Sequence, residues 1–288
     1  MHVDANGTRL WFDVHGPQLV PDGPELRRRP TLLLVHGGPG SFDHSYFKPD
    51  FDVLADDAQV VYLDLPGHGR SSWEGTDAWT LETCADDVRA FCDALGIASP
   101  VVLGHSMGGP IVLLYGARHP GHAGGLIVQS GFARWDAARL VEGFRAVGGD
   151  VVAELARRSY AGEDVSDPEW DQVYAAFGPH LPDPGLRANV PVNRDLSERG
   201  MDLIRAVDLV DQLSRVTSPV LVSVGELDPV TPVGAAEEVV AALPAGSVRL
   251  DVVPGAGHFT WLDAPDRVFA SYRRLLGEVS AASTPEHA

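Results

Sequence analysis

Six short apolar runs, each long enough for one strand, are separated by segments with helical patterns, and this alternation limits the chain to few architectures. The runs are TLLLVHG (31–37), VVYLDLPG (60–67), VVLGHS (101–106), GLIVQSG (125–131), PVLVSVGELD (219–228) and VRLDVVPGAG (248–257). Most of them are continuously apolar, which is typical of strands covered on both faces. Strands that alternate with helices form a mostly parallel sheet with right-handed crossovers. The sequence therefore predicts an α/β fold with helices on both faces of a central sheet.

The N-terminal segment precedes this pattern and predicts a different local structure. Residues 2–16 alternate around Asn6-Gly7, a dipeptide that favours the two-residue turn of a β-hairpin. The following stretch, QLVPDGPELRRRP (18–30), is interpreted as a loop.

One helix of the pattern also bears on the cysteines. Thr80 is expected to cap the helix predicted for residues 80–96. Cys84 and Cys92 lie within that helix, with their Cα atoms roughly 12 Å apart, which is too far for a disulfide bond. We therefore expect both to be buried thiols.

The alternation stops between residues 132 and 216. This stretch has interrupted helical patterns, such as ARLVEGFRAVGGDVVAELARRSYAG (138–162), and no convincing strand. We interpret residues 132–216 as a helical lid inserted between two strands, with residues 1–131 and 217–288 forming the core.

Charge narrows the range of partners. The 288 residues include 22 Lys and Arg against 40 Asp and Glu, a formal net charge of −18. Such an acidic surface repels phosphate backbones and anionic lipids, so neither nucleic acid nor membrane is expected as a partner. No apolar run reaches the length of a transmembrane helix, and the N-terminus lacks the pattern of a signal peptide. A cytoplasmic location is expected, and the sequence leaves the oligomeric state open.

The run at 101–106 leads into Gly-His-Ser-Met-Gly, followed by a helical pattern. A serine at a sharp strand-to-helix turn presents its hydroxyl above the sheet, and Gly104 and Gly108 leave room for that turn. The alternative is a chance match in a chain with 31 glycines. Its position directly after a strand favours Ser106 as a nucleophile.

A neutral serine needs a base, and the base needs an acid that holds it in the right tautomer. In enzymes whose nucleophilic serine lies at such a strand-to-helix turn, the acid follows the serine in the chain and the histidine follows the acid. Asp228 follows one later strand and His258 follows the last, so we expect both at the carboxyl edge of the sheet. Glu226 is the competing acid, but it still belongs to the strand end. A helix-capping role for Asp228 and a solvent-facing His258 are the structural alternatives.

The negative oxygen that forms during acyl transfer needs two main-chain N–H donors. Met107, directly after the serine, is expected to supply one. Gly38, in the HGGPG loop, is expected to supply the other, because a glycine lets its amide approach substrate closely. His36, His68 and His105 are interpreted as structural.

These residues predict a reaction that requires neither metal nor cofactor. Ser106 attacks an acyl carbon, His258 takes its proton, Asp228 stabilises the imidazolium, and water then releases the acyl group. The sequence contains no His-Glu-x-x-His motif, and GHGRSS (67–72) lacks the third glycine of a dinucleotide fingerprint.

The motifs resemble the α/β-hydrolase fold over nearly the whole chain, and HGGPG and GELDPVTP resemble the proline iminopeptidase and tricorn-interacting aminopeptidase family. The resemblance implies release of an N-terminal residue from small peptides or amides, with lid carboxylates binding the free amino group. Glu198, in NRDLSERG, lies close to the matching position. Its structural alternative is a solvated lid residue.

Three departures keep other substrates open. Pro229 stands where tricorn-interacting enzymes carry a second acid, Asp64-Leu65-Pro66 replaces the family's usual Asp-Gln, and GHSMGG is similar to monoacylglycerol lipases and carboxylesterases. Hydrolysis of small apolar esters or lactones, or a tailoring step in biosynthesis, is the alternative. A non-catalytic ligand receptor is the rival from another class, because one fold supports many functions.

Overall fold

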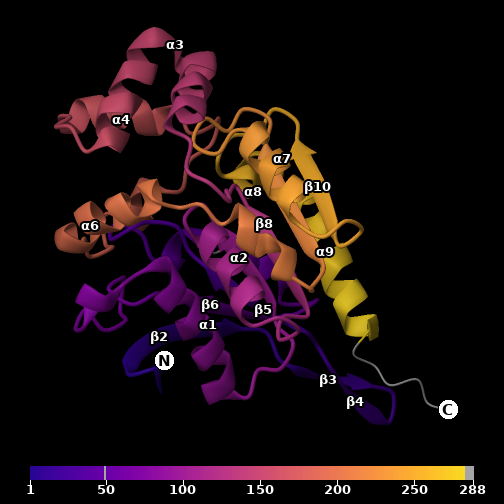
Figure 1. Cartoon of the computed structure of the whole chain (residues 1–288). Helices are drawn as coiled ribbons and strands as arrows, with labels where there is room; N and C mark the ends of the chain where they lie inside the picture. Colours follow the sequence, from indigo (N-terminus) through magenta and orange to yellow (C-terminus); the bar gives the residue numbers. More distant parts are fainter. Residues whose placement is uncertain (49, 283–288) are drawn as a thin grey trace.

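The structure is a computed structural model and describes residues 1–48 and 50–282. Its centre is an eight-stranded sheet (Figure 1). In space its strands follow the order β1-β2-β6-β5-β7-β8-β9-β10. They are β1 (His2–Ala5), β2 (Thr8–His15), β5 (Thr31–Val35), β6 (Gln59–Leu63), β7 (Val101–His105), β8 (Gly125–Gln129), β9 (Val220–Gly225) and β10 (Val248–Val253). The strands from β6 to β10 in that order are parallel, whereas β1 and β2 are antiparallel to their neighbours. The predicted, mostly parallel sheet is confirmed.

The described residues form helices that cover both faces of this sheet and further helices that lie in an insertion between β8 and β9. They are α1 (Leu81–Leu95), α2 (Gly108–Arg118), α3 (Ala137–Ala161), α4 (Asp167–Ala175), α5 (Pro184–Arg187), α6 (Arg194–Arg205), α7 (Val233–Ala242), α8 (Thr260–Asp263) and α9 (Pro265–Ala282), with 3-10 turns η1 (His44–Phe47), η2 (Asp50–Leu54), η3 (Thr76–Ala78) and η4 (Val210–Arg215). Within the described part of the chain, none of these helices is long and apolar enough to cross a membrane.

The core consists of two apolar layers, one on each face of the sheet. Side chains alternate along each strand, so Leu33 and Val35 of β5 pack with α1 and α2, whereas Leu32 and Leu34 pack with η1, η2 and α9. Both pairs are fully buried. This double burial explains why the parallel strands are continuously apolar in sequence.

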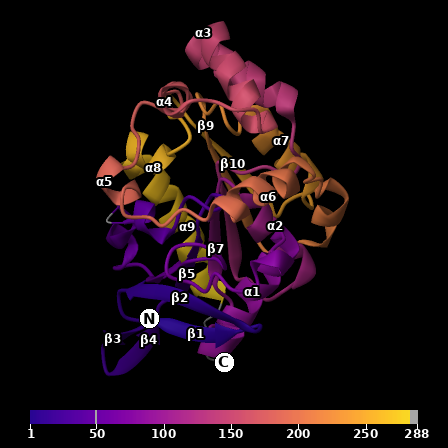
Figure 2. The same ribbon diagram turned by 90° about the vertical axis from the view of Figure 1, so that its left-hand side faces the viewer.

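The N-terminal hairpin is confirmed, but the loop predicted after it is wrong. Asn6 and Gly7 have φ of 51° and 76°, the left-handed values that a two-residue hairpin turn needs. Residues 18–30 contain a second hairpin, β3 (Leu19–Asp22) and β4 (Glu25–Arg28), which projects away from the main sheet (Figures 1 and 2). Its residues are mostly exposed, so no alternation of apolar and polar residues marks it in the sequence.

The cap of α1 and its two thiols are as expected. Thr80 Oγ1 accepts a hydrogen bond from Thr83 N–H at 3.1 Å, closing the first turn of the helix. Cys84 and Cys92 are buried and form no disulfide bond.

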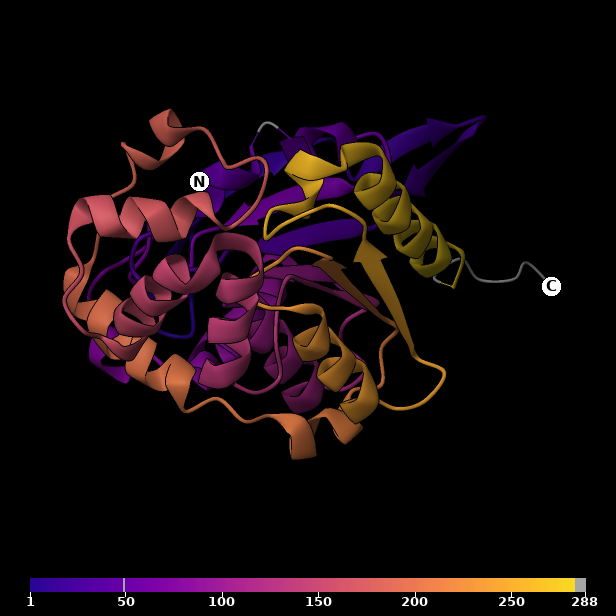
Figure 3. The ribbon, with the colours of Figure 1, turned by 90° about the horizontal axis from the view of Figure 1, so that it is seen from above.

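The chain between β8 and β9 forms a helical insertion, residues 130–219, above the carboxyl ends of the parallel strands (Figures 1 and 3). Its described residues contain α3 to α6 and η4 and no strand of the sheet. Gly149, with φ of 75°, interrupts α3 and divides it into two helical segments. Because ligands bind at the carboxyl edge of such sheets, the insertion lies where it can contact a substrate.

Gly277 offers a test of the helical packing. It occupies an exposed position inside α9, where an added methyl group would meet no atom within 4 Å. Because alanine is favoured over glycine in helix interiors, we expect Gly277→Ala to raise the free energy of unfolding by about 0.5–1 kcal/mol in urea denaturation. Gly104→Ala is the contrasting variant, since its Cβ would lie 2.1 Å from the Gly108 oxygen and should destabilise the fold severely. A loss of stability in Gly277→Ala would contradict this description of α9.

Candidate active site

Ser106 lies in the tight turn between β7 and α2, in a conformation that few residues other than glycine adopt. Its φ is 54°, in the left-handed region. A Cβ at Gly104 would lie 2.1 Å from the Gly108 oxygen, and one at Gly108 would lie 2.4 Å from the Val35 oxygen. Only glycines fit on both sides of the serine, which gives the Gly-x-Ser-x-Gly spacing a steric cause.

Asp228 and His258 are brought together at the same edge, from the loops after β9 and β10. His258 Nδ1 lies 3.0 and 2.9 Å from the two Asp228 oxygens, and both side chains are almost fully buried. Asp228 also accepts hydrogen bonds from Val230 N–H, Thr231 N–H and the Thr231 hydroxyl. Because the carboxylate only accepts, His258 carries its proton on Nδ1 and leaves Nε2 as the free base.

The competing acid has another place in the structure. Glu226 is exposed, and its Oε2 accepts a hydrogen bond from Gly255 N–H at 2.9 Å, which braces the loop after β10. Among the described residues, Asp228 is therefore the acid that contacts His258.

Ser106 and His258 line the same cavity. No hydrogen bond joins the Ser106 hydroxyl to His258 within the described part of the chain, and catalytic hydrogen bonds often tighten only when substrate is bound. The arrangement has the parts of a nucleophile, a base and an acid that orients the base.

Gly38 and Met107 line the cavity next to Ser106. In the structure as described, neither amide N–H donates to another main-chain or side-chain acceptor. The loop after β5 comes so close to the turn that a Cβ at Gly37 would lie 3.1 Å from Ser106 Cβ. Met107 also precedes the N-terminus of α2, whose positive dipole end favours negative charge. These groups are suited to hold an oxyanion.

Two neutral histidines hold the HGGPG loop in place. His36 Nδ1–H donates to the Gly37 oxygen, and its Nε2 accepts from Leu65 N–H. His68 Nε2 accepts from Gly40 N–H at 2.7 Å, while its Nδ1–H donates to the Pro66 oxygen. Each ring thus has one donor and one acceptor nitrogen in use, as expected for a structural role.

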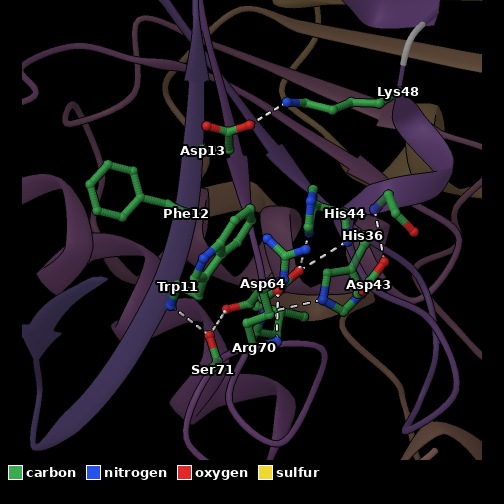
Figure 4. A network of polar contacts seen from close by, with 12 residues as sticks. Trp11, Phe12, Asp13, His36, Asp43, His44, Lys48, Asp64, Arg70 and Ser71 are labelled. Atoms are coloured by element: carbon green, nitrogen blue, oxygen red, sulfur yellow. Dashed lines mark hydrogen bonds and ion pairs between the residues drawn. The ribbon is translucent and has the colours of Figure 1, made fainter. Parts of the chain in front are cut away.

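A buried network around Asp64 braces the segments that follow the HGGPG loop and β6 (Figure 4). Asp64 Oδ1 accepts hydrogen bonds from both the main-chain N–H and Nδ1 of His44, and Oδ2 accepts from Arg70 N–H. Burial is the largest single influence on the pKa of Asp64 and raises it, but His44, His36 and the Arg70 N–H together outweigh burial and lower the pKa. Asp43, His44 and Asp64 place ligand-type atoms within 4.8 Å of one another, as a metal site would. Their oxygens already accept N–H groups, including Ser45 N–H at Asp43, which fits a structural brace better than a metal site.

The helical insertion is bonded to the HGGPG loop. Asn193 N–H, at the start of α6, donates to the Gly40 oxygen at 2.8 Å. The hydroxyl of Ser197, one turn later, donates to the Pro39 oxygen at 2.9 Å. A Cβ at Gly40 would lie 2.5 Å from the Ser197 hydroxyl, so only glycine allows α6 this close.

The insertion is also bonded to the His258 loop. His258 N–H donates to the Phe177 oxygen at 2.6 Å. Asp263, whose side chain is 4% exposed, accepts from Gly257 N–H with one oxygen and from His180 N–H and Nδ1 with the other. Sequence reasoning missed Asp263 and Ser197, because no local motif marks contacts between segments so far apart in the chain.

The cavity above Ser106 has a volume of about 200 Å³. Its wall is mainly aromatic and apolar, with polar atoms from the main chain and a few hydroxyls. Around Ser106 and His258 it is formed by Gly37, Gly38, Pro39, Ser41, Phe42, Tyr46, His105, Met107, Phe132, Trp135, Ser159, Tyr160, Trp170, Phe177, Ser197, Met201, Ile204, Val230 and Phe259. Among these described residues there is no Asp, Glu, Lys or Arg. Glu198, expected to bind an amine, is exposed on α6 and does not line the cavity.

The buried histidines predict a pH dependence of stability. Burial lowers the pKa of His68 from 6.5 to about 3. Between those values the unfolded chain binds a proton that the folded chain does not, so acidification favours unfolding. His68 alone should lower the free energy of unfolding by about 1.4 kcal/mol between about pH 7.5 and pH 5.5. The His68→Gln variant lacks the titrating ring, although the glutamine carbonyl can still accept from Gly40 N–H. In urea unfolding, its free energy of unfolding should fall less than that of the wild type over the same pH change, by that amount. Equal losses in the two proteins would contradict the assignment.

Comparison with known proteins identifies the family. A family model described as the alpha/beta hydrolase fold matches residues 30–265. A putative carbamate hydrolase from Caulobacter sp. (strain K31) is 26% identical over 284 residues, covering 94% of this chain and 97% of the relative. A monoacylglycerol lipase from Mycolicibacterium smegmatis is 27% identical over 268 residues, covering 88% of this chain and 87% of the relative. The crystal structure of proline iminopeptidase from Mycobacterium smegmatis matches with a TM-score of 0.74 and 25% identity over 99% of both chains, which confirms the expected resemblance. The chain belongs to the alpha/beta hydrolase fold family, and it is a hydrolase.

Proposed function

We propose that this hydrolase cleaves small, uncharged, apolar esters through an acyl-enzyme formed on Ser106. The buried hydrogen bonds between Asp228 and His258 support the triad, because they orient the imidazole and leave Nε2 free, and because His258 and Ser106 line the same cavity. The uncharged wall of the cavity is the observation that supports an uncharged, apolar ester as substrate.

The proposed reaction has two halves. In the first, Ser106 Oγ attacks the ester carbon while His258 Nε2 takes its proton, and Gly38 and Met107 N–H groups stabilise the oxyanion. The C–O bond to the alcohol then breaks, and His258 returns the proton to the leaving oxygen. In the second half, water attacks the acyl-enzyme with His258 again as base, which releases the acid and regenerates Ser106. Asp228 stays ionised and stabilises the imidazolium in both halves.

The cavity wall disfavours a substrate with a free ammonium group. Moving an unpaired charge into apolar surroundings costs several kcal/mol or more, and such groups are normally paired with an opposite charge. No carboxylate is among the described residues of the wall, and Glu198 faces solvent. The volume of about 200 Å³ is below the roughly 300–1,000 Å³ typical of sites for drug-sized ligands, so the acyl group is small.

Release of an N-terminal residue from small peptides or amides is the second candidate. It is supported by the match to the proline iminopeptidase structure over 99% of both chains and by the HGGPG loop. In that case the amine of the substrate would need a carboxylate that reaches the cavity, and Glu198 is the residue that the sequence offers.

The nucleophile is tested by Ser106→Ala. We expect turnover of p-nitrophenyl butyrate to fall by about 10⁴–10⁶-fold, because the acyl-enzyme cannot form. A fluorophosphonate probe should label the wild type and fail to label the variant, and urea unfolding should show that the variant is folded. If the folded variant keeps more than a few per cent of the activity, or if the wild type stays unlabelled, the proposed mechanism is wrong.

The substrate class is tested by comparing esters with amides. We expect hydrolysis of short-chain p-nitrophenyl esters and no measurable hydrolysis of proline or alanine p-nitroanilides, since the cavity offers no partner for the ammonium group. Glu198→Gln and the matched exposed variant Asp195→Asn, also on α6, should both leave ester kcat/KM within about twofold. Anilide turnover that exceeds ester turnover and is lost only in Glu198→Gln would favour the peptidase.

A further inference from the structure

Three separate segments of the site are joined by a chain of hydrogen bonds through two side chains that the proposed reaction does not use. Gly37 N–H, in the loop after β5, donates to the hydroxyl of Tyr46 at 2.7 Å. That hydroxyl lies 3.0 Å from Nδ1 of His105, the residue before the nucleophile. Nε2 of His105 lies 3.1 Å from the main-chain oxygen of His258, in the loop after β10.

The end partners and the neutral state of His105 fix the direction of every bond in this chain. An amide N–H can only donate, so the Tyr46 hydroxyl accepts from Gly37. Because burial keeps His105 neutral and its proton lies on Nε2, the Tyr46 hydroxyl donates to Nδ1. A carbonyl can only accept, so His105 Nε2–H donates to the His258 oxygen. His105 is therefore held as one neutral tautomer, and each polar atom of the chain has a partner.

The surroundings keep the bridge buried and neutral. Tyr46 is 3% exposed and His105 is 2% exposed. Burial first, and then the neighbouring His258, lowers the pKa of His105 well below its ordinary value, and burial raises the pKa of Tyr46. Aromatic rings pack around both side chains, with Phe259 at 5.3 Å and Trp261 at 4.9 Å from the His105 ring.

We propose that Tyr46 and His105 are positioning residues, which hold the His258 loop at a fixed distance from the HGGPG loop and from the turn that carries Ser106. This inference rests on the proposed function, because it concerns how accurately His258 meets the serine and the oxyanion donors. Neither residue is asked to touch reacting atoms. Their contribution is to geometry, and a displacement of about 1 Å at a catalytic group can cost about 10²-fold in rate.

Tyr46→Phe removes only the hydroxyl and keeps the ring in its packing. It leaves Gly37 N–H and His105 Nδ1 without a partner, so the three segments lose their common bridge. We expect kcat for p-nitrophenyl butyrate, corrected for the fraction of sites titrated by a fluorophosphonate, to fall about 10- to 100-fold with KM within about twofold. The correction removes any loss that comes from unfolded protein alone.

Tyr62→Phe is the matched control. The Tyr62 side chain is also buried, and its hydroxyl donates to Asp52 at 2.6 Å on the same face of the sheet, but Tyr62 does not line the cavity. It should lose stability in urea unfolding without a change in corrected kcat. An equal fall of kcat in both variants, or none in Tyr46→Phe, would overturn the proposal.

His105→Phe and the double variant test whether the two residues act as one unit. If the two residues belong to one bridge, Tyr46→Phe adds little to the loss of kcat already caused by His105→Phe. If their roles are independent, the fold-losses of kcat in the two single variants multiply in the double variant. Losses of kcat that multiply in the double variant would overturn the proposal. If His105→Phe does not fold, the kcat and KM of Tyr46→Phe alone test the proposal. Failure of the proposed function looks different and is visible in the wild type alone. The probe would then not label the wild type, or the wild type would turn over the anilides faster than the esters.

Discussion

The left-handed turn at Ser106 is the constraint on which the site depends. A non-glycine residue at φ of 54° is strained by about 1–3 kcal/mol, and it persists only where its surroundings determine it. Here Ser106 N–H donates to the Gln129 oxygen of β8, and Gly109 N–H donates to the Ser106 oxygen. The Val35 oxygen of β5 leaves no room for a side chain at Gly108. Two neighbouring strands thus hold the turn, so the hydroxyl stands at a position set by the sheet itself.

The order of strands explains why the other groups gather around that turn. From β5 the chain passes to β6 on one side of the sheet and then to β7 on the other, so the loops after β5 and β7 diverge and leave a crevice between them. Gly38 comes from the first of these loops and Ser106 from the second. Asp228 and His258 follow β9 and β10 at the same edge, although 122 and 152 residues separate them from Ser106 in the chain.

Those parts of the fold that follow from local structure could be predicted from the sequence. The strand runs, the hairpin at Asn6-Gly7 and the cap at Thr80 depend on nearby residues and are found where expected. The pairing of β3 with β4 was missed, because it is an exposed ribbon without an apolar face. The orientation of Glu198 and the hydrogen bond of Tyr46 to His105 could not be predicted for a different reason. They depend on how distant elements pack, and neither spacing nor composition records that packing.

The helical insertion contacts the proposed catalytic groups and also forms part of the cavity wall. Asn193 N–H, at the start of α6, donates to the Gly40 oxygen, and the Phe177 oxygen accepts from His258 N–H, so the insertion contacts both the HGGPG loop and the proposed base. Arg205 Nε at the end of α6 donates to the Tyr160 oxygen of α3, which links the two halves of the insertion. Residues of the same helices form the apolar wall. An insertion that moved as a free lid would break its hydrogen bonds to the HGGPG loop and to His258. The shape of the cavity and the placement of the proposed catalytic groups therefore depend on one set of contacts. A change in the insertion that altered acyl specificity would therefore also act on the position of His258.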